Sequence, residues 1–371
     1  MESTTKLRSK LFETVVDETL QHPLFREIAA NVAHMGARTL MQQTFEQWDS
    51  PDRQFVRDFQ TEGFDARVFE LYLAATLDSL GWTVGAESDR PDFRCLGSDL
   101  EFYVEAATAH SPGNPKTPTS PDEYYKELLS ATDNFDEVAV RFGSVLRNKA
   151  KKAYQDLPHV AGKPIVIAIQ GFFGAGVLFH TETPLIRYLY DLVLTEIDES
   201  GTIYPTDAPV GFHIGDSKTI KSDWFHNRDA AYISAVMWSN SGTVAKFNRM
   251  AASLGLGAPG WEIHRFGTEL DPQPGATKPV LFVERVEPCG EPWEEGLVIM
   301  HNPRAKVPLP LSAFEGMTQI RQVDNTLRED LRGRKIYNQR SFPHREVDRS
   351  KILEMIDVWI SGIEWGSNRV F

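Results

Sequence analysis

The chain has 371 residues, of which 41% are hydrophobic, and a net charge of −13. This length allows one large or two modest domains with a real core, and no apolar run approaches the ~18 residues that a membrane-spanning helix needs. Only Cys95 and Cys289 occur, far apart in the chain, which argues against disulfide scaffolding and structural zinc and favours a reducing, cytoplasmic setting. The first twenty residues lack an apolar core with a cleavage site, so no secretory leader is expected.

Residues 1–63 are expected to form a helical N-terminal extension, and the pattern of residues 65–80 predicts an amphipathic helix. Its apolar stripe consists of Ala66, Phe69, Leu73, Leu77 and Leu80. Glu70 falls inside this stripe, where a carboxylate costs several kcal/mol unless it is paired or binds a metal. The alternative interpretation is that Glu70 reaches an arginine such as Arg67 or Arg90.

Three short strands are expected next, over residues 82–85, 92–96 and 101–107, and they should form a meander. The last strand alternates with period two, and Glu105 projects from its middle beside a small neighbour, Ala107, that leaves room for a ligand. Asp92 follows Pro91, just before the middle strand, and could equally be an ordinary turn aspartate.

A helix is expected over residues 141–157, with an apolar arc that should pack on the sheet. Lys149 falls within or against this arc and Lys152 at its edge, whereas Lys151 points to the solvated side. A lysine turned toward the sheet could serve a site there, although a lysine whose stem lies along the apolar surface and whose ammonium reaches solvent would give the same pattern.

The remaining pattern predicts a buried strand at 164–169, a helix at 185–197 and a strand at 230–238, which ends a core placed at 64–240. Residues 241–371 are expected to form an accessory α+β region with further strands and a closing helix. In this region His301 and Asn302 could contact a substrate, but a structural histidine is the favoured interpretation. A Pro/Thr/Ser-rich stretch at 111–122 could gate a site, and a surface insertion is the default interpretation.

This order of helix with Glu, hairpin with Pro-Asp, strand with Glu, helix with Lys and buried strand resembles the restriction-endonuclease-like PD-(D/E)XK nuclease superfamily. The resemblance covers about residues 64–170 and implies an α/β fold with an αβββαβ core and a mixed central sheet flanked by helices. It implies that Asp92 and Glu105 bind Mg²⁺ (or Mn²⁺), that Glu70 completes the metal shell, and that nucleic acid, with DNA favoured, is hydrolysed.

One position departs from the superfamily pattern. The lysine expected two residues after Glu105 is Ala107. In branches of the superfamily this lysine migrates to the next helix, and on that basis Lys149 is the first candidate and Lys152 the second. The alternative is a catalytically silent relative that acts as a binding or assembly module.

The acidic net charge opposes a general nucleic-acid binder, because affinity for DNA depends on neutralising phosphates. Local basic stretches occur at 147–152, 219–228 and 328–340, each of which could also be a solvated face. A homodimer would suit cutting of two strands, and the resemblance suggests restriction or phage defence. No P-loop, serine elbow or paired histidine motif is present, so ATP hydrolysis, serine hydrolysis and zinc chemistry are not expected.

Overall fold

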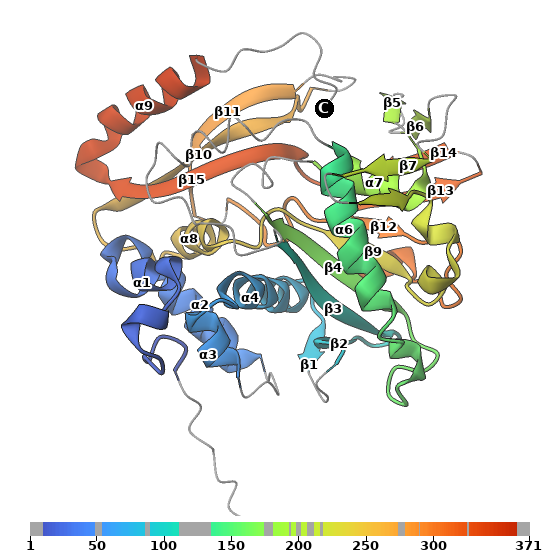
Figure 1. Ribbon diagram of the computed structural model, residues 1–371. Coiled ribbons are helices and arrows are strands. Elements are labelled where there is room, and N and C mark those ends of the chain that lie inside the picture. Colours follow the sequence, from blue (N-terminus) through green and yellow to red (C-terminus); the bar gives the residue numbers. More distant parts are fainter. Residues whose placement is uncertain are drawn as a thin grey trace, which may run out of the picture.

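The computed structural model describes residues 10–48, 54–85, 90–110, 135–173, 181–192, 194–197, 202–205, 211–215, 218–273, 279–288, 290–324 and 326–361. Figure 1 shows a large central sheet flanked by helices, with a second, smaller sheet beside it. The expected mixed α/β architecture is therefore present. No helix in these ranges is long and apolar enough to cross a membrane.

The central sheet has ten strands in the order β1-β2-β3-β4-β9-β12-β13-β14-β6-β5. The strands, in sheet order, are β1 Thr83–Gly85, β2 Phe93–Leu96, β3 Glu101–His110, β4 Ile165–Phe172, β9 Ala235–Trp238, β12 Val298–His301, β13 Thr318–Val323, β14 Thr326–Asp330, β6 Thr202–Pro205 and β5 Leu194–Ile197. Strands β3, β4 and β9 run parallel, and β1, β2 and β3 form the expected antiparallel meander. Strands β12 to β14 lie beyond residue 240 and belong to the same sheet, so the boundary expected there divides one continuous sheet.

The two faces of β3 pack against different helices. Phe102 and Val104 belong to the hydrophobic cluster that contains the residues of α4, Phe64–Ser79. Tyr103 and Ala107 belong to the cluster that contains α6, Phe135–Ala150. Period-two alternation puts Glu105 on the same face as Tyr103 and Ala107, as expected, and this face packs against α6.

Three expected elements end or begin elsewhere. The helix expected to reach residue 157 ends at Ala150, and Ala153 adopts a left-handed conformation with φ of 51°. The helix expected over 185–197 ends at Tyr190, where Asp191 turns the chain with φ of 60°, and residues 194–197 form β5. The strand expected over 230–238 begins only at Ala235, after a 3₁₀ turn.

The other helices frame the sheets. They are α1 Pro23–Ala30, α2 Met35–Gln47 and α3 Phe55–Gln60 from the N-terminal segment, α7 Thr183–Tyr190, α8 Val244–Ser253 and α9 Arg349–Ser361. The second sheet has the order β11-β10-β15, with β11 Pro279–Arg285, β10 Trp261–Leu270 and β15 Ile336–Arg345, and β7 Phe212–Ile214 pairs with β8 Thr219–Lys221. Helix α9 lies along the outer side of the second sheet in Figure 1.

A buried ionic network joins α8 to the second sheet. Glu291, whose side chain is 1% exposed, receives Lys246 at 2.6 Å, Arg249 at 2.8 Å and Arg265 at 3.3 Å. Arg265 also contacts Glu295 at 2.5 Å. Burial lowers the pKa of Lys246 to about 8. The positive charges of Arg249 and Lys246 keep the pKa of Glu291 below its ordinary value, although burial alone would raise it. Because each charge has a partner, the network orients α8 on β10.

Candidate functional site

Glu105 is the centre of the candidate site, and its carboxylate meets both lysines that the sequence proposed. Lys149 Nζ lies 2.6 Å from Glu105 Oε1 and also donates to the Ala106 carbonyl at 2.6 Å. Lys152 Nζ lies 3.3 Å from the same Oε1. The glutamate side chain is 3% exposed, whereas Lys149 and Lys152 are 21% and 43% exposed. Lys149 from the last turn of α6 and Lys152 from the turn that follows α6 therefore present two cations to a buried carboxylate of β3.

Asp92 directly precedes β2, which pairs with β3 on the edge opposite β4. Its Oδ2 accepts a hydrogen bond from the Ala106 amide at 2.7 Å, which fixes the carboxyl next to the Glu105 segment. Burial, followed by the charges of Glu105 and Glu70, raises the pKa of Asp92 to about 8, although Lys149 and the Ala106 amide oppose the shift. Asp92 is thus a carboxyl held among other carboxyls, an arrangement that a bound cation would stabilise in its ionised form.

Glu70 is buried on α4 and pairs with an arginine, which is the alternative that the sequence left open. Arg67 NH1 contacts Glu70 Oε2 at 2.9 Å, and Arg67 NH2 contacts Asp58 at 2.7 Å. Glu70 is nevertheless close enough to Asp92 to raise its pKa. Glu70, Asp92 and Glu105 do not bring one oxygen each within 4.8 Å of one another in this structure. The three acids converge on one region, but Glu70 and Glu105 pair with the chain's own cations and Asp92 accepts a backbone amide, so they do not form a closed coordination shell.

One buried oxygen of this group lacks a partner. Glu105 Oε2 is inaccessible to solvent and has no hydrogen-bond partner among the described residues, while Oε1 takes both lysines. A buried carboxylate oxygen without a donor is costly, and oxygen is the ligand that Mg²⁺ prefers. The donor set of Asp92 and Glu105 therefore fits a hard divalent cation.

Tyr154 is a member of this site that the sequence did not reveal. Its side chain is 1% exposed, and its hydroxyl also has no hydrogen-bond partner among the described residues. Burial, the charge of Glu105, the approach of the hydroxyl to the Glu105 carboxylate and the charge of Asp92 raise its pKa above the ordinary value, so the hydroxyl lies beside that carboxylate without a well-formed hydrogen bond. Tyr154 lies in the 3₁₀ turn that follows Ala153, where a helix was expected, so the helical pattern gave no reason to direct it at Glu105.

No family model, curated protein or solved structure matches this chain. The resemblance to PD-(D/E)XK nucleases therefore gains no support from sequence or structural relatives.

Two other sequence candidates have structural roles. His301 Nε2 pairs with Gln319 Oε1 at 2.8 Å, and the Asn302 amide donates to the carbonyls of Ala230 and Ile233. Both side chains are buried, in agreement with the interpretation that the sequence favoured. The Pro/Thr/Ser-rich stretch at 111–122 lies outside the described residues.

The basic stretch at 328–340 is largely neutralised within the fold. Lys335 contacts Glu329 at 2.7 Å, Arg334 contacts Glu269 at 2.6 Å, and Arg328 contacts Asp330 at 3.2 Å. It therefore supplies little free positive charge for a phosphate backbone.

Three side chains of the kinds that bind metal ions come close together on the second sheet. Among the described residues, the group of His, Cys, Asp or Glu whose ligand atoms lie within 4.8 Å of one another is Glu262, His264 and His344, on the second sheet. The sequence gave no zinc expectation because these histidines are 80 positions apart, yet the period-two spacing of Glu262 and His264 already placed them on one strand face.

Proposed function

We propose that this protein hydrolyses phosphodiester bonds of nucleic acid, with DNA the favoured substrate, at a Mg²⁺-dependent (or Mn²⁺-dependent) site built on Asp92 and Glu105. The observation that carries this proposal is the buried Glu105 carboxylate, which has one oxygen bound by Lys149 and the other without a partner, next to the strongly perturbed Asp92. Carboxyls whose pKa is strongly shifted by burial and by a specific charged neighbour cluster at functional sites.

The order of elements adds support for the finer fold expectation. Among the described elements, α4, β1, β2, β3, α6 and β4 follow the αβββαβ order of the restriction-endonuclease-like core, with α4 and α6 on opposite faces. Asp92 and Glu105 come from the elements that the superfamily uses for its two acids. The lysine differs, because Lys149 lies on the following helix and not at position 107 of the strand.

Each residue has a definable task in such a reaction. Asp92 and Glu105 would hold the cation, which when bound lowers the pKa of water and neutralises charge on the scissile phosphate. Lys149, anchored on the Ala106 carbonyl, would orient the nucleophilic water or stabilise the phosphate charge of the transition state. Lys152 is the more exposed of the two lysines and is suited to a phosphate oxygen of the substrate.

A second candidate function has its own observation in favour. The lysines engage Glu105 directly, Arg67 engages Glu70, and Ala107 replaces the usual lysine. Such internal pairing would also suit a silent relative that keeps the fold as a binding or assembly module. This alternative predicts a protein that binds without cleaving.

Cleavage assays separate the two. Purified protein would be incubated with supercoiled plasmid, linear duplex and single strands in Mg²⁺, Mn²⁺ or EDTA, alongside Glu105→Gln and, as a matched control in the same hairpin, Asp99→Asn. We expect metal-dependent cleavage that Glu105→Gln abolishes and Asp99→Asn retains. Absence of cleavage on every substrate, with substrate binding that metal does not alter, would favour the binding module.

A further inference from the structure

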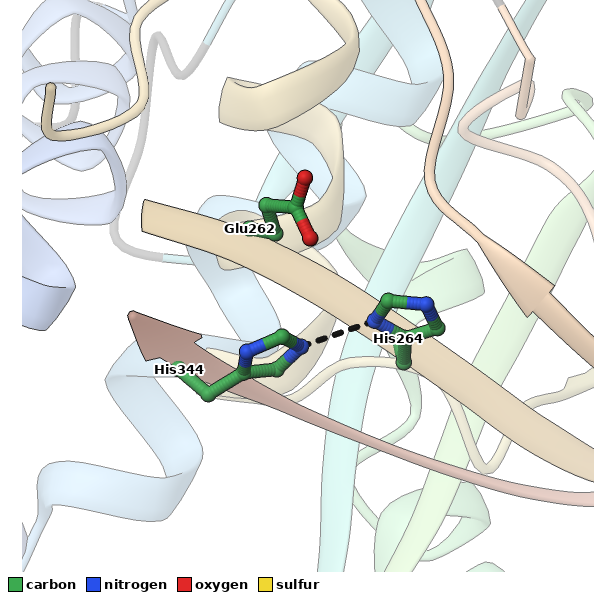
Figure 2. Close-up of side chains that lie close together, drawn as sticks. All are labelled: Glu262, His264 and His344. Carbon is green, nitrogen blue, oxygen red and sulfur yellow. Dashed lines mark hydrogen bonds between the residues drawn. The ribbon is translucent and has the colours of Figure 1, made fainter. Parts of the chain in front are cut away.

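The second sheet carries a histidine pair that belongs to none of the chemistry above. His264 on β10 and His344 on β15 are both 5% exposed, and His264 Nδ1 lies 2.7 Å from His344 Nε2. In the β10–β15 register Glu262 lies directly opposite His344, so the three side chains share one face of the sheet. Figure 2 shows the two imidazoles edge to edge with the Glu262 carboxylate beside them.

This face looks away from the buried ionic network and toward α9. Arg265 and Ser341, which contact Arg249 or Glu291 on the α8 side, alternate with the residues of the histidine face. Arg349, the first residue of α9, instead bonds Glu262 Oε2 at 2.7 Å. The pair therefore lies between β10, β15 and the start of α9.

The hydrogen bonds define the tautomers. His344 Nδ1 lies 2.9 Å from the Arg345 carbonyl, which can only accept, so Nδ1 carries the proton and Nε2 of the neutral ring carries a lone pair. That lone pair accepts from His264 Nδ1, and His264 Nε2 has no partner among the described residues. An imidazole that donates its far nitrogen to a backbone carbonyl is oriented as metal-ligating histidines are.

We propose that Glu262, His264 and His344 form a binding site for a transition-metal ion of the Zn²⁺ class, which fastens β10 to β15 beneath α9. The site requires that the His264 proton move from Nδ1 to the free Nε2, after which both facing nitrogens present lone pairs and no proton is lost. Two nitrogens on tetrahedral Zn²⁺ lie about 3.3 Å apart for Zn–N bonds of about 2.0 Å, so the rings must separate by about 0.6 Å. Each ring must also tilt by about 35°, because lone pairs that point along the N···N line must turn toward one ion.

Glu262 can serve as the third ligand without leaving its arginines. Its two oxygens offer about four lone pairs, and the three hydrogen bonds from Arg285 and Arg349 occupy three of them. The arginines do not make the site cationic, because Arg285 also pairs with Glu287 and Arg349 with Glu346. Two nitrogens and one carboxylate oxygen suit Zn²⁺, Co²⁺ or Ni²⁺ and are a poor set for Mg²⁺.

The test is metal binding by the full chain after chelation and dialysis. Titration with Co²⁺, followed by visible absorption, and with Zn²⁺, followed by calorimetry, should show one ion per chain. Binding should weaken at least 100-fold in His264→Ala and in His344→Gln and should be unchanged in His226→Ala, an exposed histidine outside this sheet. It should also persist in Asp92→Asn, which separates this site from the proposed Mg²⁺ site.

X-ray absorption at the zinc edge of the wild-type protein gives a readout that needs no variant. We expect a scattering pattern with two imidazole ligands and a carboxylate oxygen. Failure of the wild-type chain to bind a stoichiometric ion, a zinc spectrum without imidazole, or unchanged affinity in both histidine variants would overturn the proposal.

Discussion

Replacement of Asp92 by asparagine should stabilise this protein in the absence of metal. The folded-state pKa of about 8 exceeds the ordinary value of 3.8, so the folded chain keeps a proton that the unfolded chain releases. The free energy of unfolding of the wild type should therefore fall as the pH rises from about 4 to about 8. An amide has the shape of the protonated carboxyl, can still accept from the Ala106 amide and does not ionise, so the variant should escape this loss.

The magnitude follows from the same shift. Each pKa unit corresponds to about 1.36 kcal/mol. The difference between the ordinary pKa of 3.8 and the assay pH of about 7 therefore limits the increase in the free energy of unfolding to about 4 kcal/mol. Because water reaches part of the Asp92 side chain, we expect about 1 to 3 kcal/mol at pH 7 and almost none at pH 4.

The assay is chemical denaturation in EDTA at several pH values for the wild type, Asp92→Asn and Asp99→Asn. Asp99 is exposed in the same hairpin, and its replacement should change stability by less than ~0.5 kcal/mol. Added Mg²⁺ should stabilise the wild type and leave Asp92→Asn unaffected. A destabilised Asp92→Asn protein in EDTA at pH 8, or a stability difference independent of pH, would refute the reasoning.

Further variants test the neighbours of this carboxyl. Lys149→Met should lower a metal-dependent cleavage rate about 100-fold in steady-state assays, whereas Lys151→Met, an exposed neighbour, should not; equal rates in both would remove Lys149 from the mechanism. Tyr154→Phe removes a hydroxyl that lies beside the Glu105 carboxylate without a well-formed hydrogen bond, so unfolding should show little loss of stability; a loss above ~2 kcal/mol would mean that the hydroxyl is bonded. Glu291→Gln leaves Lys246 and Arg249 without their carboxylate in the core and should cost about 3 to 5 kcal/mol in denaturant titrations; a neutral effect would contradict the buried network.

Short-range patterns predicted the part of the fold around the site. The period-two alternation of β3 set the direction of Glu105, and the helical stripe of α4 placed Glu70 in a buried seam, since both depend only on local geometry. The helical phase of α6 turned Lys149 toward the sheet, whereas Lys152 follows the end of the helix at Ala150 and reaches Glu105 from the next turn.

The sequence did not predict how segments far apart in the chain are arranged in space. The continuation of the central sheet through β12, β13 and β14 depends on strand pairing across large separations, which no local pattern encodes. The left-handed Ala153 redirects the chain and brings Tyr154 to the acids, although alanine is not a residue that marks such a turn. The choice of Arg67 as the partner of Glu70 depended on rotamers, and the sequence left it open.

The most direct test of the central claim is a time course of DNA cleavage at pH 8 with Mg²⁺ or EDTA for the wild type, Asp92→Asn and Asp99→Asn. Asp92→Asn is the decisive variant because it should be at least as stable as the wild type, so lost activity cannot be attributed to unfolding. We predict Mg²⁺-dependent cleavage by the wild type and Asp99→Asn and at least a 100-fold lower rate in Asp92→Asn. Equal Mg²⁺-dependent rates in all three proteins, or no cleavage by the wild type, would contradict the assignment of this site.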